Sequence, residues 1–515
     1  MRLVGGLIKR ALTLADRIQG LGQTPIDLQR KTLRRLIRKA QFTAFGKHFN
    51  FSDILYSSDI IKSFQENVPF YDYDKIHDEW WYRSLQNKSD ITWPGKIKYF
   101  ALSSGTTGAP SKYLPMTDDM IRYIRKAGFK SIFASTRFDL DADFFTTQGL
   151  FIGGSTTLKE MDGYHVGDMS GINLKASSLW LSSFSRPGRQ IQSIQDWNRR
   201  IEIIARNAPK WDIGFISGIP SWVQLMIEKI IAYNKVDNIH DIWPNLQVIV
   251  HGGIAFEPHR KAFDALMRKP IVYIDTYLAS EGFIAFQNRP ETKAMALILN
   301  NGVFHEFIPF NDENFTSDGN VKGKPRAYTV DEVKTGVEYA VVISTCAGAW
   351  RYQIGDTVRF TDTVRKELLI TGRTKQFLSV TGEHLSVDNM NQGIQYAQDI
   401  LKTDVKEFTV AAVETETGFA HRWYIGCEPS VDASTFGQLL DKRLCEVNDD
   451  YATERNSVLR DPQVEIISPQ LFLDYMKSQG KIGGQSKFPR VMKTKHFAEW
   501  ETFIAGKRQR MMLLE

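Results

Sequence analysis

A run of hydroxyl side chains and glycines follows an apolar stretch at 97–102 and ends in a lysine. It reads Ser103, Ser104, Gly105, Thr106, Thr107, Gly108, Ala109, Pro110, Ser111 and Lys112. Hydroxyl and backbone N–H groups donate hydrogen bonds to anions, and glycine lets the backbone approach them closely. The run does not match the GxxxxGK[ST] pattern of a Walker A loop. It is a candidate phosphate site, although an ordinary loop has the same composition.

A carboxylate follows the predicted strand at 271–277. The segment runs Tyr277, Leu278, Ala279, Ser280, Glu281 and Gly282. Ligands of open α/β sheets bind at the carboxyl ends of the strands, so Glu281 is well placed to hold a magnesium ion that bridges phosphate oxygens. The alternative is that Ser280 caps a helix and Glu281 lies in its first turn.

Three further segments carry candidate binding residues. His251, Gly252 and Gly253 end another predicted strand, where two glycines let a flat ring lie against the backbone. Asp356 follows a glycine and suits a ribose diol, although a plain turn containing Asp fits equally well. The run 480–490 places glycines around lysines, as a solvated loop does. Taken singly, none of these segments identifies a function.

The elements that must position these residues follow from hydrophobic periodicity. Helical patterns dominate the first 90 residues. From about residue 97, short apolar runs alternate with helical segments, which predicts a largely parallel sheet covered by helices. The predicted strands are 97–105, 149–154, 213–218, 246–253 and 271–277, and the predicted helices are 117–134, 190–207, 219–233 and 258–268.

The second half of the chain has two other patterns. A β-rich stretch from about 337 to 371 predicts an antiparallel extension or a small barrel. Beyond it the pattern predicts a small α+β unit, with helices at 387–402, 433–449 and 469–478 and strands at 405–414, 419–428 and 463–468. We therefore predict an α/β fold with two domains. Residues 1–374 form a large domain with mostly parallel sheets and a small β-rich extension, and residues 375–515 form a small mobile domain.

Composition excludes several classes of protein. The 515 residues are 42% hydrophobic and 24% charged, which excludes a disordered tail, a collagen and a disulfide scaffold. The three cysteines, Cys346, Cys427 and Cys445, are scattered and have no metal-ligand spacing. No apolar run approaches a membrane-spanning length, and the first residues are too interrupted for a secretory signal. A cytoplasmic location is expected.

Positive charge is concentrated at the start of the chain. Residues 1–49 hold eleven Lys or Arg against two Asp, whereas the whole chain has a net charge of +6. Leu28, Leu33, Leu36 and Ile37 recur between the basic residues at roughly helical spacing. We interpret the segment as the solvated face of an amphipathic helix. The alternative is a surface for nucleic acid or an anionic membrane.

Together and in this order, the motifs resemble the adenylate-forming superfamily, and more closely the auxin-responsive ("Gretchen Hagen three") family of acyl-acid amido synthetases. Residues 103–112 match the family's phosphate loop, and 277–281 match its Tyr-x-x-Ser-Glu run. Its late Gln-x-Lys-x-Pro-Arg run is matched by Gln485, Lys487, Pro489 and Arg490. One departure is Gln353, where the family's Tyr-Arg-x-Gly-Asp motif has Arg, although Arg351 lies two residues earlier.

The resemblance implies two half-reactions. ATP and a small carboxylic acid give an acyl-adenylate and pyrophosphate, and an amine, usually of an amino acid, then displaces AMP. Phosphates would be bound by Ser103, Ser104, Gly105, Thr106, Thr107 and Lys112. Glu281, beside Ser280, would hold magnesium, and Gly252, Gly253 and Tyr277 would border the adenine. Asp356 and Arg373 would bind the ribose. Lys487 would take part in adenylation after a rotation of the small domain near Lys375 carries it into the site.

Three alternatives remain. An acid–thiol ligase would pass the same adenylate to coenzyme A. A protein that keeps the fold without catalysis is disfavoured by the joint presence of the phosphate loop, Glu281, Asp356 and Lys487. A nucleic-acid partner rests on residues 1–49 alone and is not expected. The acid pocket is expected to involve segments 160–190 and 215–230 with the residues around His251. The motifs leave open whether the acid is aromatic or fatty.

Overall fold

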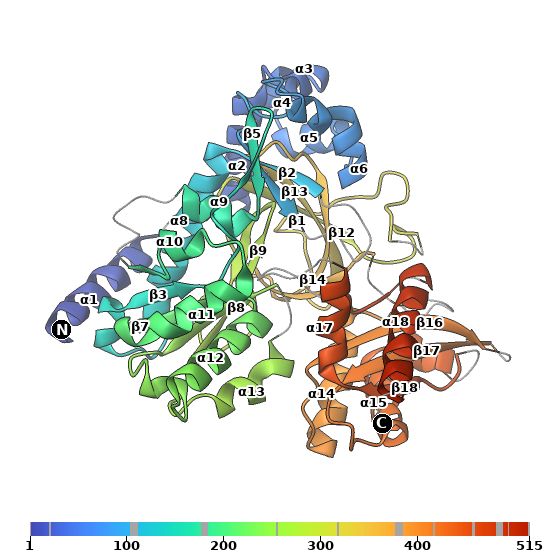
Figure 1. Ribbon diagram of the computed structural model, residues 1–515. Helices are drawn as coiled ribbons and strands as arrows, with labels where there is room; N and C mark the ends of the chain where they lie inside the picture. Colours follow the sequence, from blue (N-terminus) through green and yellow to red (C-terminus); the bar gives the residue numbers. More distant parts are fainter. Residues whose placement is uncertain are drawn as a thin grey trace.

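The structure is a computed structural model that describes residues 2–19, 22–103, 112–176, 184–253, 256–316, 319–375, 378, 385–415, 418–455, 459–479, 488–492 and 494–512. Its centre is a mixed sheet of eleven strands in the order β12-β13-β14-β15-β11-β10-β9-β8-β7-β3-β6. A four-stranded sheet lies above it, and a three-stranded sheet belongs to a separate C-terminal unit (Figure 1). The predicted α/β fold class is confirmed.

The described part of the first 85 residues is mainly helical, as the sequence predicts. The helices are α1 (Arg2–Gln19), α2 (Pro25–Ala40), α3 (Ala44–His48), α4 (Phe51–Tyr56), α5 (Ile60–Asn67), α6 (Tyr73–Ile76) and α7 (Tyr82–Leu85). Helix α2 begins at a Thr24 cap with Pro25 in its first turn. Leu33, Leu36 and Ile37 are buried while most of its basic residues are exposed, so the interpretation as an amphipathic helix is confirmed for α2.

One half of the large sheet is parallel. Its strands are β3 (Gln148–Phe151), β6 (Ser185–Arg186), β7 (Ile213–Gly218), β8 (Val248–Gly252) and β9 (Val272–Ala279). One face of this half is covered by α11 (Trp197–Asn207), α12 (Pro220–Asn234) and α13 (Arg260–Ala265). The opposite face lies toward α1 and α8 (Asp118–Ala134), with the short helices η2 (Ser135–Arg137) and η3 (Ala142–Thr146).

The other half is antiparallel and continues the same sheet. Its strands are β10 (Gly282–Phe286), β11 (Met295–Leu297), β12 (Val303–Pro309), β13 (Glu338–Thr345), β14 (Tyr352–Asp362) and β15 (Glu367–Arg373). Of the two predicted arrangements for the β-rich stretch, the extension is therefore correct and the barrel is wrong. The sequence pattern did not indicate β10, β11 and β12.

The predicted strand at 97–105 differs from expectation. It forms β1 (Tyr99–Ser103), which lies outside the large sheet and pairs antiparallel with β2 (Lys112–Met116). The small sheet is completed by β4 (Lys159–Met161) and β5 (Tyr164–Gly167). Helix α9 (Met169–Lys175) follows β5 on the way to the large sheet, and α10 (Arg189–Gln192) lies between β6 and α11. A glycine-bounded apolar run does not reveal which sheet it joins, because that depends on distant partners.

The C-terminal unit follows the predicted pattern closely. It comprises α14 (Val387–Leu401), β16 (Glu407–Thr415), β17 (Gly418–Gly426), α15 (Ala433–Val447), α16 (Asp449–Arg455), β18 (Gln463–Ile467), α17 (Pro469–Ser478) and α18 (Thr494–Met512). No apolar core cluster among the described residues combines side chains from both sides of residue 375. The boundary between 374 and 375 stays a prediction that this separation supports.

Disulfides and membrane-spanning helices were not expected from the sequence. All three cysteines lie in the described part of the chain and are free thiols. Of the helices that the structure describes, none combines the length and the apolar character needed to cross a bilayer.

Candidate active site

A cavity of about 2620 Å³ extends along the carboxyl ends of β8 and β9 to the C-terminal unit. Glu281, Asp356 and Lys112 line it together, although they are far apart in the sequence. Asp388 of α14 and the segment 488–492 line its other side. Apart from Ser103, the predicted binding residues that the structure describes therefore line one cleft between the two units.

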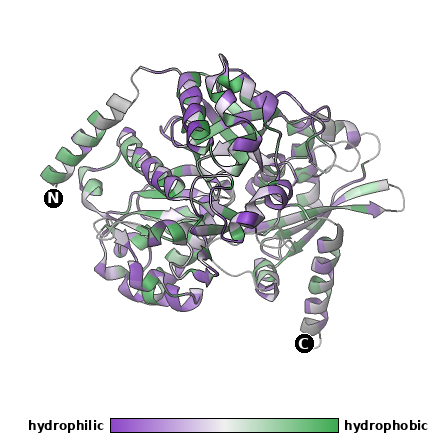
Figure 2. Ribbon diagram, turned by 90° about the horizontal axis from the view of Figure 1, so that it is seen from above, coloured by the Kyte–Doolittle hydropathy of each residue, from purple (hydrophilic) through white to green (hydrophobic). Residues whose placement is uncertain are grey.

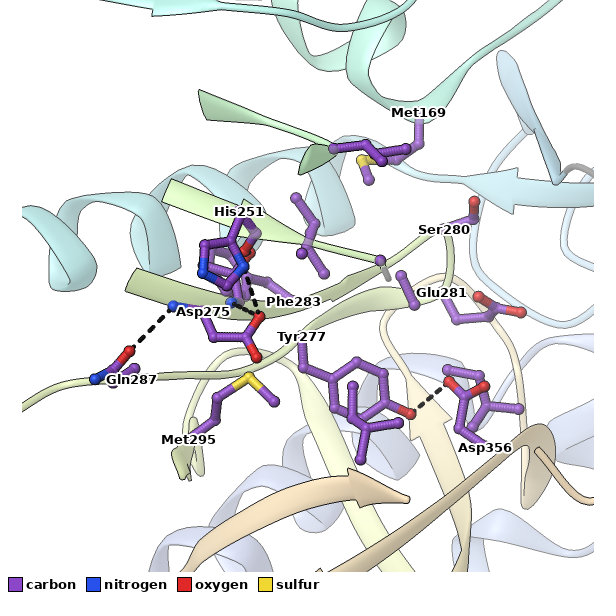
Figure 3. A pocket seen from close by; sticks show the side chains of 18 of the residues that line it. Met169, His251, Asp275, Tyr277, Ser280, Glu281, Phe283, Gln287, Met295 and Asp356 are labelled. Atoms are coloured by element: carbon purple, nitrogen blue, oxygen red, sulfur yellow. Dashed lines mark hydrogen bonds and ion pairs between the residues drawn. The ribbon is translucent and has the colours of Figure 1, made fainter. Parts of the chain in front are cut away.

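Glu281 lies on a tight turn at one end of the large sheet. Strands β9 and β10 pair through Ala279 and Gly282, so only Ser280 and Glu281 form the connection. Figure 3 shows Glu281 projecting toward the side of the sheet where Asp356 lies. The alternative of a helix capped by Ser280 is wrong, because β10 begins at once. A hairpin turn fixes the Glu281 backbone from both sides.

Asp356 is held at both of its carboxylate oxygens. The Tyr277 hydroxyl donates to Oδ2 at 2.7 Å, and Arg373 Nε donates to Oδ1 at 2.8 Å (Figure 3). The residues come from β14, β9 and β15, and Asp356 pairs with Arg373 across the β14–β15 ladder. Each carboxylate oxygen keeps a further lone pair for a hydroxyl donor. The arrangement suits a vicinal diol.

The four charged groups of the cleft influence one another. Burial and, to a smaller extent, the charge of Asp356 raise the pKa of Glu281 to about 7, although Arg373 and Lys112 oppose the rise. The pKa of Lys112 is lowered by burial, with Glu281 acting in the opposite direction. The neighbouring Asp356 carboxylate raises the pKa of Arg373. The cleft therefore joins two carboxylates to two cations within electrostatic range.

The two glycines at the end of β8 are required by the backbone. A Cβ at Gly252 would lie 2.3 Å from the carbonyl oxygen of Thr276 on the neighbouring strand. Gly253 has a φ of 85°, in the left-handed region that favours glycine. Both line the cavity, as predicted for residues that contact a flat ring. Their positions satisfy the local backbone whether or not a ring binds there.

No group of three or more His, Cys, Asp or Glu side chains in the described ranges is arranged to hold a metal ion by itself. A magnesium ion that accompanies a nucleotide needs only one or two protein carboxylates, because the phosphates and water supply its other ligands. Glu281 fits that requirement, since Asp356 beside it is occupied by Tyr277 and Arg373, and the nearby cation Lys112 is in position to share the phosphates.

Several predicted site residues lie outside the described residues, namely Ser104, Gly105, Thr106, Thr107 and Lys487. The structure does describe how the chain is anchored next to them. Ser103 and Lys112 are paired partners at the ends of β1 and β2. Lys112 Nζ lies 5.2 Å from the centre of the Tyr73 ring. The segment after Lys487 is fastened to β16, where Thr409 Oγ1 donates to the Pro489 carbonyl at 2.9 Å.

Arg351 does not replace the arginine missing at 353. Its Nη2 lies 3.0 Å from Glu306 Oε1, and its Nη1 donates to the carbonyls of Gln65 and Val68 at 2.7 and 2.8 Å. Both charged side chains are buried, with 5% of Arg351 and none of Glu306 exposed. The guanidinium is therefore committed to an internal ion pair, although both Arg351 and Gln353 border the cavity.

Sequence reasoning missed a polar pair beside the predicted adenine residues. His251 Nδ1 lies 3.4 Å from Asp275 Oδ1, and the His251 ring stacks on Phe256 with 4.3 Å between centroids. The backbone of Asp275 is itself held in place, because its N–H donates to Gln287 Oε1 at 3.2 Å. An acidic residue inside the apolar run at 271–277 was the signal available. The pair fixes the end of β8 against β9.

Comparison with solved structures identifies the class of fold. The chain matches the GH3.15 acyl acid amido synthetase over 96% of its own length and 95% of the other chain, with a TM-score of 0.75 at 16% identity. It also matches a 2-hydroxyisobutyryl-CoA ligase in the postadenylation state over 93% and 91%, with a TM-score of 0.58 at 12% identity. At these identities the likeness concerns the fold alone, which the chain shares with both of these enzymes.

Family models then identify the chain more narrowly. The GH3 family N-terminal domain matches residues 14–206, the central domain matches 296–370, and the C-terminal domain matches 388–496. The three segments follow the family's order and cover most of the chain. The protein belongs to the GH3 family, as its motifs predicted.

Curated relatives agree over part of the sequence. Indole-3-acetic acid-amido synthetase GH3.4 of Arabidopsis thaliana is 26% identical over 278 residues, which is 49% of this chain and 45% of that protein. Jasmonoyl–L-amino acid synthetase JAR4 of Nicotiana attenuata is 30% identical over 185 residues, 33% of this chain and 30% of that protein. The chain thus spans less than half the length of these relatives.

Proposed function

We propose that this protein is an ATP-dependent ligase that adenylates a carboxylic acid and transfers the acyl group to the amine of an amino acid, as the names of its curated relatives suggest. The observation that carries the proposal is the pairing of Glu281 on its hairpin turn with the Tyr277–Asp356–Arg373 arrangement in one cleft. Family membership and the names of its curated relatives support the choice of amide formation.

In the first half-reaction, a carboxylate oxygen attacks the α-phosphorus of ATP and pyrophosphate leaves. Asp356 would accept hydrogen bonds from the ribose hydroxyls, and Gly252, Gly253 and Tyr277 would border the adenine. Lys112, with Ser103, Ser104, Gly105, Thr106 and Thr107, would bind the phosphates. Phosphoryl transfer of this kind depends on positioning and on neutralised charge more than on a proton carrier.

Magnesium would be held by Glu281 together with the phosphates, and when bound it offsets the charge that develops on the leaving pyrophosphate. Ser280 shares the hairpin turn with Glu281 and would set its approach to the cleft. In the second half-reaction the amine nitrogen forms a bond to the acyl carbon, the bond from that carbon to AMP breaks, and the amine loses a proton. Lys487 would serve only the first half-reaction.

The test is pyrophosphate release with ATP and magnesium across a panel of carboxylic acids, each assayed with an amino-acid mixture, with coenzyme A and with neither. The proposal expects release that depends on an acid, increases with amino acids and yields an amide by mass spectrometry. Stimulation by coenzyme A alone would move the chain to the acid–thiol ligases. Absence of release with every acid, in a protein that binds ATP by calorimetry, would contradict the proposed activity.

The expected cytoplasmic location is a separate prediction, supported by the three free thiols.

A further inference from the structure

The two faces of the parallel half-sheet are packed differently. Under α11 and α12, Ile216 and Ile249 are completely buried. On the opposite face of the same strands, Phe215 and Val250 are only half-buried, and both line the large cavity. A packed core leaves few voids larger than a water molecule, so side chains in the interior of a sheet become partly exposed where a space adjoins them. This face borders an unfilled apolar space.

Helix α8 forms the opposite wall of that space. Ile124, Gly128 and Ile132 recur every four residues, which places them on one side of the helix, and all three line the cavity. A Cβ added at Gly128 would find no heavy atom within 4 Å. The helix therefore leaves open volume beside the sheet where another residue would fill it.

Helix α1 closes the far end. Ile8 and Leu12 line the cavity from this helix. Gly5 packs so closely on η3 that a Cβ would lie 1.9 Å from the Ala142 carbonyl oxygen, and Lys9 Nζ donates to the Leu140 carbonyl at 2.8 Å. Figure 2 shows α1 at the edge of the molecule, largely in the hydrophobic colour. The apolar side of an amphipathic helix thus borders the space at the side remote from Glu281.

Polarity changes along the length of this space. At the carboxyl ends of β8 and β9, Gly252 and Thr276 border the nucleotide cleft, whereas Val248 and Val272 line the cavity at the other ends of the strands. Four residues of strand separate Val248 from Gly252, or about 13 Å at the usual rise of a strand. Arg125, bonded to the Ala176 carbonyl, and the exposed Asp139 line the cavity in this region, as do the polar side chains of Ser131, Ser135 and Thr147. The deep part has a mainly apolar lining, to which Phe138, Phe144 and Phe145 contribute.

We propose that the acid substrate has a long aliphatic chain, with its carboxylate at the nucleotide cleft and its tail between the sheet and α8, extending toward α1. The inference rests on the proposed function and narrows it, and it replaces the small acid expected from sequence. Each methylene buried contributes about 0.8 kcal/mol, so affinity should rise about fourfold per added carbon until the space is full.

The experiment measures two quantities on the full chain for straight-chain acids of four to sixteen carbons and for indole-3-acetate and benzoate. The first is acid binding by calorimetry without ATP, and the second is pyrophosphate release with ATP and magnesium. Gly128→Leu is the test variant, because it fills the open volume and replaces glycine in a helix, which favours folding. Gly506→Leu in α18 is the matched control, since this exposed helical glycine also has free space around it.

The expected result is affinity and kcat/KM that rise steeply with chain length in the parent and in Gly506→Leu. Gly128→Leu should lose at least tenfold for the longest acids and little for the shortest. Pyrophosphate release that favours benzoate or indole-3-acetate, or equal losses for every acid in Gly128→Leu, would overturn the chain-length inference and leave the ligase proposal standing. Chain-length-dependent binding without pyrophosphate release from any acid would support the inference and remove the ligase proposal.

Discussion

Asp356 receives hydrogen bonds from two different strands, and this predicts a specific kinetic defect. Asp356→Asn should raise the KM for ATP at least tenfold, because an amide has one acceptor atom in place of two and no charge to pair with Arg373, so it accepts fewer hydrogen bonds from the ribose hydroxyls. Initial rates of pyrophosphate release at varied ATP give the value. Asp362→Asn at the far end of the same strand is the control, and ATP kinetics as in the parent would exclude Asp356 from the ribose site.

Glu281 links the activity to pH. With its pKa raised to about 7, the carboxylate needed for magnesium is half protonated near neutrality. We expect kcat/KM for ATP to fall about tenfold per pH unit below pH 7, and a profile that is level from pH 5.5 to 8.5 would contradict the assignment.

The raised pKa of Glu281 also predicts that the protein is less stable at high pH, where activity is expected to be highest. The folded state holds the Glu281 proton more tightly than the unfolded chain, whose pKa is near 4.5, so stability falls as the pH rises through the interval up to about 7. Glu281→Gln should therefore raise the free energy of unfolding at pH 8 by on the order of 1 kcal/mol, the full effect being reduced by solvent in the cleft, and leave it unchanged at pH 4. Urea titrations at the two pH values measure this, with the exposed Glu313→Gln as control.

The ion pair between Arg351 and Glu306 distinguishes a structural arginine from a nucleotide ligand. Arg351→Met leaves the Glu306 charge buried without its partner, which should cost about 3–5 kcal/mol of unfolding free energy in urea. The double variant with Glu306→Leu should recover much of that loss. Unchanged stability together with a raised KM for ATP would show instead that Arg351 serves the nucleotide.

At the scale of elements, the sequence pattern predicted the bounds of individual helices and strands but not which strands pair. Helix α17 (Pro469–Ser478) and strand β7 (Ile213–Gly218) agree with prediction at both ends, because Pro469 follows a Ser468 cap and the apolar run 213–218 is bounded by polar or glycine residues. The partners of β1, by contrast, are β2 and β5, one of them more than 60 residues away. Nothing within the run 97–105 encodes that choice.

Within the candidate site, short motifs could be recognised from the sequence, whereas contacts between distant residues could not. Motifs predicted Glu281, Asp356 and Arg373 as site residues, because each motif is a short run of residues, and the structure brings the three into one cleft. The role of Arg351 was not predicted, since its partner Glu306 is 45 residues away in sequence and is recognisable only after β12 and β14 are placed in one sheet. The apolar space beside α8 was also missed, since a glycine such as Gly128 does not show from sequence whether it faces a neighbour or a void.

At the scale of the whole molecule, the C-terminal unit supplies one wall of the cleft. The segment 488–492 lines the cavity and is fastened to β16, directly after Lys487. We expect Lys487→Ala to reduce adenylation, measured as ATP–pyrophosphate exchange, at least a hundredfold, while ATP binding by calorimetry stays within threefold of the parent. The control is Lys477→Ala on α17, an exposed lysine of the same unit. Equal exchange by Lys487→Ala and the parent would remove Lys487 from the chemistry.

The strand that ends at Arg373 connects the two units of the protein. Arg373 binds Asp356, and the next residue, Thr374, donates its backbone N–H to the Gly355 carbonyl at 2.8 Å. The chain that leads into the C-terminal unit is thus attached to the same turn that would hold the ribose. Thermodynamic reciprocity then applies: if the orientation of the C-terminal unit alters ATP affinity by some factor, bound ATP must bias that orientation by the same factor. The nucleotide would be an effector of domain orientation as well as a substrate.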